Sequence, residues 1–452
     1  MVQFGRLTAV TDALQTAREV LAGDEAWLVG GAVRDRLLSR ATDDIDLAVP
    51  GDPKPLARRL AKRAGGASFE LSGAFGAWRV VGPGHGWHID LVTLRDGDID
   101  ADLAHRDFTI NAMAEPLAGG ELRDPFGGRR DLEQRLVRMV SERALSDDPL
   151  RTLRAVRIAV ELGLDIDPET ARAAQANAAA IERVAAERVF GELKRVINAD
   201  AVRRGLALMD ELGLTDAVLP ELTELKGVEQ SHFHHLDVYE HTLAVLDEVT
   251  VLEREHALLA EPLSDELTRG QAMRWAALLH DAAKPRTRDQ LPDGRVTFIG
   301  HDVAGAELAR DVLGRLRSSQ KLREYVAALV THHLDAGFLV HQRPLDRRTI
   351  WRYLRATRPY SEDVTLFTIA DRKATRGKNA EPAIAAHLEV AQTLIEAARE
   401  PVPEPLVRGN ELADIASGPQ LGQILAQLEE DRFAGAITTR EQALERAREL
   451  AR

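Results

Sequence analysis

The stretch that decides the fold runs from residue 26 to residue 49 and reads AWLVGGAVRDRLLSRATDDIDLAV. Its apolar residues 27–29 predict a short buried strand. Gly30-Gly31 then allows a tight turn into a helix that begins near Ala32. Backbone N–H groups and the positive end of the helix dipole at this turn favour an anion such as a triphosphate, and Arg34 adds a fixed positive charge. Taken alone, such a turn is more often a plain strand-to-helix connector.

Two acids follow within the same stretch, in Asp44-Ile45-Asp46-Leu47-Ala48-Val49. Because side chains alternate along a strand, Asp44 and Asp46 project from one face while the apolar residues cover the other. Neighbouring carboxylates repel each other unless a cation neutralises them. A hard ion such as Mg²⁺ does so, and phosphoryl transfer needs one to bridge phosphate and attacking oxygen. A solvated acidic turn running into a strand is the alternative.

The pattern GG-x-V-R-D followed by D-x-D resembles the head of the nucleotidyltransferases that build or extend RNA 3′ ends. These are the tRNA CCA-adding enzymes and their poly(A) polymerase relatives. The resemblance implies that Gly30, Gly31 and Arg34 bind the nucleotide, and that Asp44 and Asp46 are catalytic and hold Mg²⁺. It also implies tRNA as the partner, with CTP and ATP as substrates.

Short strands are expected at 68–71, 78–81 and 88–92, which together with the opening strands predict a mixed sheet with flanking helices. Asp90 lies on the last of them and is the candidate for a third catalytic carboxylate. An exposed edge residue is the alternative for a single acid on a strand.

The segment HRDFTINAMA at 105–114 resembles the family's R-R-D-F-T-I-N-A motif, with His105 replacing the first arginine. The resemblance implies that Arg106 faces the triphosphate and that Asp107 accepts from both hydroxyls of the ribose. Family members typically carry a long flexible loop before this motif, whereas only residues 96–105 intervene here. Within the family that deletion is associated with members that add only two cytidines, so CC addition and full CCA addition both remain open.

The next motif, SDDPLRTLRAVR at 146–157, predicts a helix with Ser146 as its N-cap. Asp148 and Arg151 lie three residues apart, hence on one exposed side. An Asp acceptor beside an Arg donor fits cytosine and adenine, which present an amino donor next to a ring-nitrogen acceptor, but not uracil or guanine. The pair could therefore select C and A without a template. An ordinary salt bridge on a helix surface is the alternative.

This stretch resembles the family's E-D-x-x-R motif, with Asp147 in place of the glutamate. The resemblance implies that Arg154 and Arg157 bind phosphate or base. A further resemblance, in ERVFGELK at 187–194, implies an acid and arginine network that braces the base-reading helix.

A second group of candidate metal-ligating residues begins beyond residue 230. The ordered set His241, His280-Asp281 and Asp371, with Lys-Pro after the dipeptide, resembles the helical HD phosphohydrolase domain. Imidazoles and carboxylates suit a divalent metal, Mg²⁺, Mn²⁺ or Ni²⁺, that activates water against a phosphate ester. His301 and His332 are candidates for a second ion. A domain that keeps the fold without activity is the alternative, and three further histidines, His256, His341 and His387, are expected at the surface.

Composition sets the outer limits. The chain has 452 residues, a net charge of −13 and no cysteine, which excludes disulfides and thiolate metal sites. Its arginines crowd the segment 123–204, so a basic RNA-binding stripe on an acidic protein is expected. The alternative is that these arginines are exposed helix charges balanced by neighbouring acids.

No apolar run is long enough to span a bilayer and the N-terminus lacks a targeting pattern, so we expect no membrane contact and a cytoplasmic location. The oligomeric state is not predicted.

The expected fold class is α+β, with a mixed sheet in the head and helices elsewhere. Four parts are predicted: a nucleotidyltransferase head at 1–140, a helical neck at 141–225, an HD domain at 226–400 and C-terminal helices at 401–452. Two rival functions remain. One is a poly(A) polymerase of the same family, and the other is a phosphohydrolase whose head only docks RNA.

Overall fold

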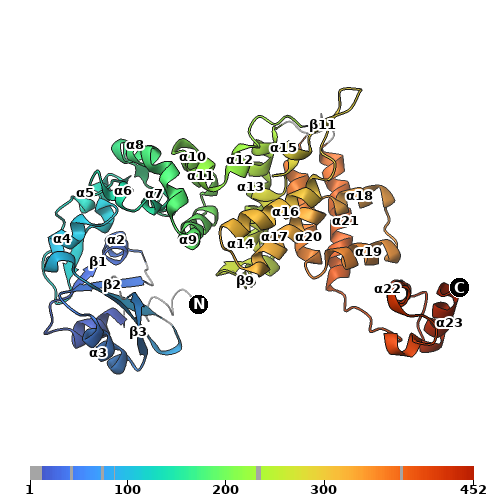
Figure 1. Ribbon diagram of the computed structural model, residues 1–452, viewed down its shortest axis with the longest axis horizontal. Helices are drawn as coiled ribbons and strands as arrows, with labels where there is room; N and C mark the ends of the chain where they lie inside the picture. Colours follow the sequence, from blue (N-terminus) through green and yellow to red (C-terminus); the bar gives the residue numbers. More distant parts are fainter. Residues whose placement is uncertain (1–12, 41–43, 73–75, 86, 231–235, 377–379) are drawn as a thin grey trace. The chain divides into compact units, whose positions relative to one another are not determined.

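The computed structural model describes residues 13–40, 44–72, 76–85, 87–230, 236–376 and 380–452. The chain forms two compact units, Met1–Val218 and Leu219–Arg452 (Figure 1). The α+β class is confirmed, since a six-stranded mixed sheet lies in the first unit and helices dominate the rest. The four-part division at 140, 225 and 400 stays a prediction.

The sheet has the strand order β3-β4-β5-β2-β1-β6. Only the β2–β5 pair is parallel among these strands. The predicted strands are all present, with the bounds β1 Trp27–Val29, β2 Asp44–Val49, β3 Ala67–Ser72, β4 Ala77–Val81 and β5 His88–Thr93. The sixth strand, β6 Ala114–Pro116, was not predicted.

The register aligns the candidate acids across the sheet. Asp46 is the Cα partner of Asp90 on β5, and Asp90 is the partner of Arg79 on β4. Side chains of paired residues share a face, so the two acids and the arginine form one row. The intervening residues Ile45 and Leu47 on β2 are buried at 1% and 0% exposure. The sheet therefore places the acids on one face and core residues on the other.

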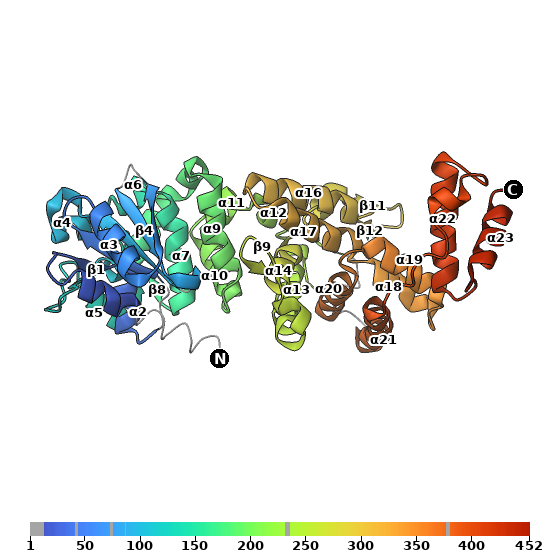
Figure 2. The same ribbon diagram turned by 90° about the horizontal axis from the view of Figure 1, so that it is seen from below.

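The head contains the helices α2 Gly31–Leu37, α3 Lys54–Ala64, α4 Ile99–Ala104 and α5 Gly128–Glu133, and residues 13–20 are also helical (Figure 2). Helix α5 packs against η3 (Thr109–Asn111), the short 3₁₀ turn inside the HRDFTINAMA segment. The Thr109 hydroxyl donates to buried Asp131 Oδ2 at 2.8 Å, and Arg138 Nε donates to the same oxygen at 3.1 Å. Helix α5 thus fixes that segment in place.

The helices of the neck follow in the same unit: α6 Ala144–Asp147, α7 Leu150–Leu162, α8 Pro168–Asn177, α9 Ala186–Ile197, α10 Val202–Glu211 and α11 Leu214–Val218. The predicted single helix beginning after Ser146 is wrong, because Ser146 lies in α6 and α7 starts at Leu150. Asp148 between them is extended, with φ −141° and ψ 98°. The residue before a proline is disfavoured in the helical region, and Pro149 follows Asp148.

The second unit is helical. Its main helices are α13 Val238–Glu255, α14 Arg269–Leu279, α16 His301–Arg315, α17 Gln320–His332, α19 Arg347–Thr357, α20 Ser361–Ala374 and α21 Ala380–Arg399, followed by α22 Gly418–Phe433 and α23 Arg440–Leu450. Buried Asp431 on α22 accepts from Arg348 of α19 and, at 2.9 Å, from Arg446 of α23. These contacts attach the C-terminal helices to α19. No helix in the described ranges combines the length and the apolar character that crossing a bilayer requires.

Gly128, at the start of α5, provides a test of this packing. A Cβ there would lie 2.2 Å from the Thr109 carbonyl oxygen, so we expect Gly128→Ala to lower the free energy of unfolding by about 1–3 kcal/mol. Thermal unfolding followed by circular dichroism measures the change. The matched control is Gly191→Ala in α9, where a Cβ meets nothing within 4 Å and a small gain is expected. Equal melting temperatures for the two variants would contradict the packing argument.

Candidate active site

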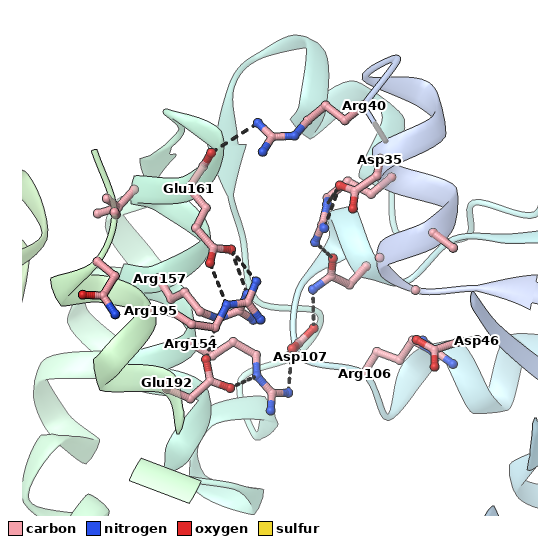
Figure 3. Close-up of a pocket in the computed structure, with 18 of the residues that line it drawn as sticks. Asp35, Arg40, Asp46, Arg106, Asp107, Arg154, Arg157, Glu161, Glu192 and Arg195 are labelled. Atoms are coloured by element: carbon pink, nitrogen blue, oxygen red, sulfur yellow. Dashed lines mark hydrogen bonds and ion pairs between the residues drawn. The ribbon is translucent and has the colours of Figure 1, made fainter. Parts of the chain in front are cut away.

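The glycine turn and the strand acids form the floor of the first site. Gly30 has φ 71°, and a Cβ at this position would lie 2.7 Å from Arg106 Nη1 and 3.5 Å from Asp46 Oδ2. The absent side chain therefore lets Arg106 lie over the turn beside Asp46 (Figure 3). Helix α2 spans only seven residues, so the fixed charges, more than a helix dipole, define an anion site here. Asp44 lies on β2, but its side chain is outside the described part of the structure.

Arg34 is fixed by its neighbours. Its Nε donates to Asp35 at 2.8 Å, and its Nη1 donates to the Asn111 side-chain oxygen at 2.7 Å. Asn111 in turn donates to Asp107 Oδ1 at 3.0 Å. The glycine turn and the HRDFTINAMA segment, predicted to share a nucleotide, are thus joined by a chain of hydrogen bonds.

Asp107 is the buried centre of the site. Its Oδ1 also accepts from the Phe108 backbone N–H at 2.8 Å, and its Oδ2 accepts from Arg154 Nη1 at 3.2 Å. Burial raises the pKa of Asp107, but Arg154 and these hydrogen bonds outweigh burial and hold the pKa below its usual value.

The three hydrogen bonds to Asp107 fill three of the roughly four acceptor positions of its carboxylate. The one position that is left can accept from one ribose hydroxyl rather than from the two expected.

Arg154 and Arg157 on α7 share one acid on α9. Glu192 accepts from Arg154 Nε at 2.9 Å and from Arg157 Nε at 2.5 Å. Burial lowers the pKa of Arg154, but Asp107 and Glu192 raise it above the usual value. The expected bracing network is present, and it links the head to α7 and α9 through charged side chains.

These residues enclose two cavities of about 1020 Å³ and 770 Å³. Asp46 and Arg34 line the larger one, and Arg151 lines the smaller one. Arg106, Asp107 and Arg154 line both. The cavity lined by Asp46 and the cavity lined by Arg151 are therefore adjacent.

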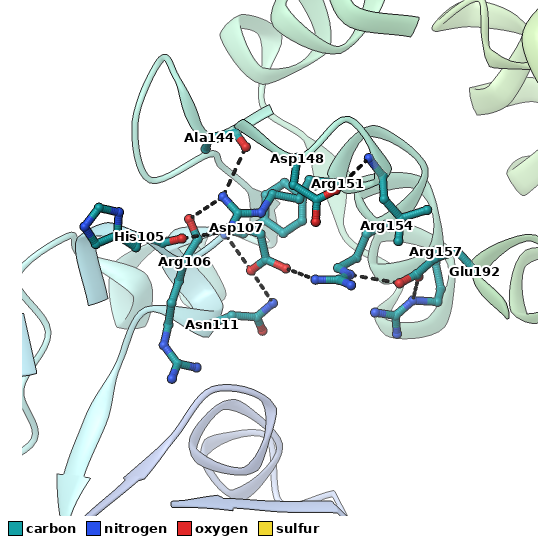
Figure 4. A network of polar contacts seen from close by, with 12 residues as sticks. His105, Arg106, Asp107, Asn111, Ala144, Asp148, Arg151, Arg154, Arg157 and Glu192 are labelled. Carbon is teal, nitrogen blue, oxygen red and sulfur yellow. Dashed lines mark hydrogen bonds and ion pairs between the residues drawn. The ribbon is translucent and has the colours of Figure 1, made fainter. Parts of the chain in front are cut away.

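The reader pair itself differs from expectation. Arg151 donates to backbone carbonyls of His105, Arg106 and Ala144 at 2.7–3.2 Å, while Asp148 accepts from Arg188 of α9 at 2.8 Å (Figure 4). Among the described residues, the buried Arg151 Nε has no hydrogen-bond partner. Arg188 lies in the ERVFGELK segment, whose resemblance implied a bracing network of acids and arginines but not this particular pair.

Asp90, the candidate third carboxylate, forms a bidentate ion pair with Arg79, both contacts being 2.7 Å. It lies beside Asp46 in the sheet register, as predicted. Its negative charge is already compensated by the arginine. A direct catalytic role for Asp90 stays a prediction.

The second unit brings its predicted ligands together in one place, here called the HD cluster. His241 Nε2 lies 3.0 Å from Asp371 Oδ1, and His280 Nε2 lies 3.1 Å from Asp281 Oδ2. Two groups of ligand atoms, each within 4.8 Å of one another, are His241, His280 and Asp371, and Asp281, His301 and His333. Burial raises the pKa of Asp281 and the neighbouring cationic groups lower it, leaving it well below its usual value.

Backbone carbonyls orient three of these imidazoles. Nδ1 of His280, His301 and His333 lies 2.9, 2.6 and 2.7 Å from the carbonyl oxygens of Ala277, Phe298 and Val330. A carbonyl can only accept, so Nδ1 carries the proton and the neutral ring presents a lone pair at Nε2. The Nε2 atoms of His301 and His333 are 3.3 Å apart. Two lone pairs at this distance fit a cation between or beside them.

Two histidine expectations need correction. His332 is not in the HD cluster; its Nδ1 contacts Asp335 at 2.8 Å, and His333 takes the expected place. Consecutive helical residues point about 100° apart, and a His-His doublet does not reveal which one faces inward. His387 is buried at 3% exposure and its Nε2 lies 3.0 Å from the Thr368 hydroxyl, so its predicted surface position is wrong.

Comparison with known proteins agrees with this geometry. Family models match residues 26–95 and 88–138 as a poly A polymerase head domain, 163–226 as a probable RNA- and SrmB-binding site of polymerase A, and 238–376 as an HD domain. An A-adding tRNA nucleotidyltransferase of Deinococcus radiodurans is 39% identical over 92% of this chain and 94% of its own length. The chain belongs to the tRNA nucleotidyltransferase family.

Other relatives of the family extend this picture. A CC-adding tRNA nucleotidyltransferase of Thermus thermophilus is 36% identical over 93% of this chain and 92% of its own length. The solved structure of a CCA-adding enzyme in its apo form superposes with a TM-score of 0.64 at 21% identity, covering 98% of this chain and 95% of the other. That structural likeness shows the shared fold. The chain is accordingly an enzyme of the nucleotidyltransferase class with an HD domain.

The Glu192 bridge yields a stability prediction. Glu192→Gln leaves Arg154 and Arg157 without their shared countercharge in a site where Glu192 is 12% exposed, so we expect a loss of about 1–3 kcal/mol in the free energy of unfolding. Denaturant unfolding measures it. The control is Glu169→Gln, whose ion pair with Arg172 spans 3.8 Å between side chains at least 70% exposed. Its change should stay within about 0.5 kcal/mol, and an equal loss in both variants would refute the bridging role.

Proposed function

We propose that the first unit adds cytidine from CTP to the 3′ end of tRNA without a nucleic-acid template. The observation that carries the proposal is the shared lining of the two cavities. Arg106, Asp107 and Arg154 connect the acid-bearing strand to the helix that carries Arg151. A nucleotide bound across this boundary would have its phosphates near Asp46 and its base near α7.

The residues that would hold the phosphates are Gly30, Gly31, Arg34 and Arg106. The two arginines would balance the charge of the departing pyrophosphate as the terminal tRNA hydroxyl bonds to the α-phosphorus. Asp44 and Asp46 lie on one strand face and would hold Mg²⁺, which when bound neutralises phosphate charge and favours the attacking oxygen. The carboxylate of Asp46 lies within reach of this turn, which fits such an ion.

Base selection would fall to Asp148 and Arg151. Asp148 has acceptor capacity beyond its contact with Arg188, and Arg151 would exchange a backbone carbonyl for the base. A cytosine amino group would donate to Asp148 and its ring nitrogen would accept from Arg151. Uracil presents the reverse order and would face acceptor to acceptor, so it would be rejected.

The short segment before His105 supports cytidine addition over complete CCA addition. Residues Arg95–Gly97 and Ile99–Ala104 form η2 and α4, so short helical turns occupy the whole connection from β5 to the motif. The two relatives named above carry opposite names, A-adding and CC-adding, at 39% and 36% identity. Overall sequence similarity therefore does not distinguish A addition from CC addition. The short connection before His105, in place of the long flexible loop, is the feature that favours CC addition.

We propose a second activity for the HD cluster, the metal-dependent hydrolysis of phosphate esters. The lone pairs at Nε2 and the buried acids fit divalent ions, which when bound supply an activated water molecule. One ion would be held by His241, His280, Asp281 and Asp371. A second would be held by His301 and His333, with Asp281 contributing to both.

Nucleotide addition is tested with tRNA lacking its 3′-terminal CCA, given CTP alone, ATP alone or both, with product lengths read on a sequencing gel. We expect extension by CTP, and Asp46→Ala should reduce it by more than about 100-fold because phosphate charge is no longer neutralised. His280→Ala, in the other unit, is the matched control and should leave extension intact. Efficient addition of A after CC would refute the loop argument, and long A tails would favour a poly(A) polymerase.

The second ion is tested by metal content after loading with Mn²⁺ and gel filtration. His333→Ala should lose one bound ion per chain relative to the unmodified protein, because a ligand of the second group is removed. His332→Ala, its neighbour in sequence, should lose none. The proposal fails if both variants retain the full content, or if only His332→Ala loses an ion.

A further inference from the structure

The row of paired residues that carries the strand acids continues to the edge of the sheet. Asp90, the partner of Asp46, pairs with Arg79 on β4. Arg79 in turn pairs with Phe69 on β3, the outermost strand on this side of β2. Paired residues project from the same face, so Phe69 lies on the face that carries the acids. At about 4.8 Å per strand spacing, the row from Asp46 to Phe69 spans about 14 Å.

Helix α3 covers the opposite face of these outer strands. Glu70, which follows Phe69, pairs with Trp78 of β4, and both therefore project from that opposite face. Lys54 and Arg58 of α3 lie over the Trp78 ring, 5.5 and 5.9 Å from its centre. Phe69 points away from this helix and is 47% exposed. An aromatic ring is thus open to solvent on the face where nucleotide addition is proposed.

The direction of nucleotide addition indicates which molecule reaches this face. As the terminal RNA hydroxyl oxygen bonds to the α-phosphorus, the bond to pyrophosphate breaks and the hydroxyl proton is released. The attacking and leaving oxygens lie roughly in line in such a transfer. The residues proposed to hold the departing phosphates, Gly30, Gly31 and Arg34, follow β1, which lies on one side of β2. The attacking RNA end would therefore approach from the other side, over β5, β4 and β3.

We propose that Phe69 stacks on one of the last two bases of the RNA whose 3′ hydroxyl is extended. The inference rests on the proposed nucleotide addition and adds a residue that positions the RNA end. Every base has a π-face, so an aromatic ring can hold a single-stranded end without reading its sequence. An enzyme that lengthens its own substrate needs this tolerance, because the last bases change after each addition.

Arg79 favours RNA as the occupant of this face. It lies between Asp90 and Phe69 in the row, and its side chain is 33% exposed. A phosphate next to the stacked base would therefore meet a guanidinium group, which hydrogen-bonds strongly to phosphate oxygens. An apolar protein segment docked on Phe69 would make no use of this cation.

The test uses the full chain and a tRNA that already ends in the first cytidine, so that its last two nucleotides are unpaired. Addition from CTP is compared for the intact RNA and for two forms that are abasic at the last or at the preceding nucleotide. Losing the stacked base should lower kcat/KM for the RNA by about 5- to 150-fold with the unmodified protein. Phe69→Ala should lower kcat/KM for the intact RNA by a similar factor and should no longer distinguish it from that abasic form. The KM for CTP should stay unchanged.

Three further variants serve as controls. Phe69→Tyr keeps the aromatic ring and should behave as the unmodified protein. Phe69→Leu keeps an apolar side chain without a ring and should resemble Phe69→Ala. Phe338→Ala removes a phenylalanine that is 67% exposed on α18 (Asp335–Leu339) in the other unit, and it should change neither constant.

The outcomes separate this inference from the proposal on which it rests. If the unmodified protein adds no cytidine to the intact RNA, nucleotide addition fails and the inference fails with it. If cytidine is added but Phe69→Ala reduces kcat/KM equally for the intact RNA and both abasic forms, Phe69 has a structural role and stacking is refuted. If Phe69→Ala changes only the oligomeric state in gel filtration, this strand face binds a second copy of the chain instead of RNA.

Discussion

The ion network of Asp107, Arg154 and Glu192 is the constraint on which the first unit depends. Asp107 belongs to the head, whereas Arg154 and Glu192 belong to two neck helices, α7 and α9. Buried charges are tolerated only when they are paired, so none of the three can move away without a large penalty. The network thereby keeps the side of the site that carries Asp46, on β2, next to the side that carries Arg151, on α7. This is the physical reason for proposing that both sides bind one nucleotide.

The two candidate base-reading residues are also engaged with the protein. Arg151 donates hydrogen bonds to three backbone carbonyls in and near the HRDFTINAMA segment, and Asp148 accepts one from Arg188. These contacts satisfy the polar atoms of both side chains in the absence of a base, apart from Arg151 Nε. A cytosine read by this pair would have to offer hydrogen bonds at least as good as those it replaces. This requirement would be a source of selectivity, since a base with the wrong pattern would leave groups unpaired.

Alternation of apolar and polar residues predicted most of the strands, because every second residue of β2 and its neighbours faces the core. The HD ligands were predicted on other grounds, because the ordered set His241, His280-Asp281 and Asp371 resembles the HD domain. Pairings between distant side chains were not predictable. Nothing in the sequence pairs Asp90 with Arg79, and the ERVFGELK resemblance implied a bracing network without pairing Asp148 with Arg188. The choice of His333 over His332 depends on a helix rotation of one residue. Likewise, Pro149 displaced the helix start from Ser146 through a backbone effect that motif matching overlooks.

The proposed nucleotide site is tested most directly by a structure of the chain bound to CTP and Mg²⁺. We expect the triphosphate at Gly30, Gly31 and Arg106. We also expect the cytosine amino group on Asp148, with its ring nitrogen facing Arg151. A nucleotide whose base points away from α7, or whose phosphates lie apart from Asp46, would contradict it.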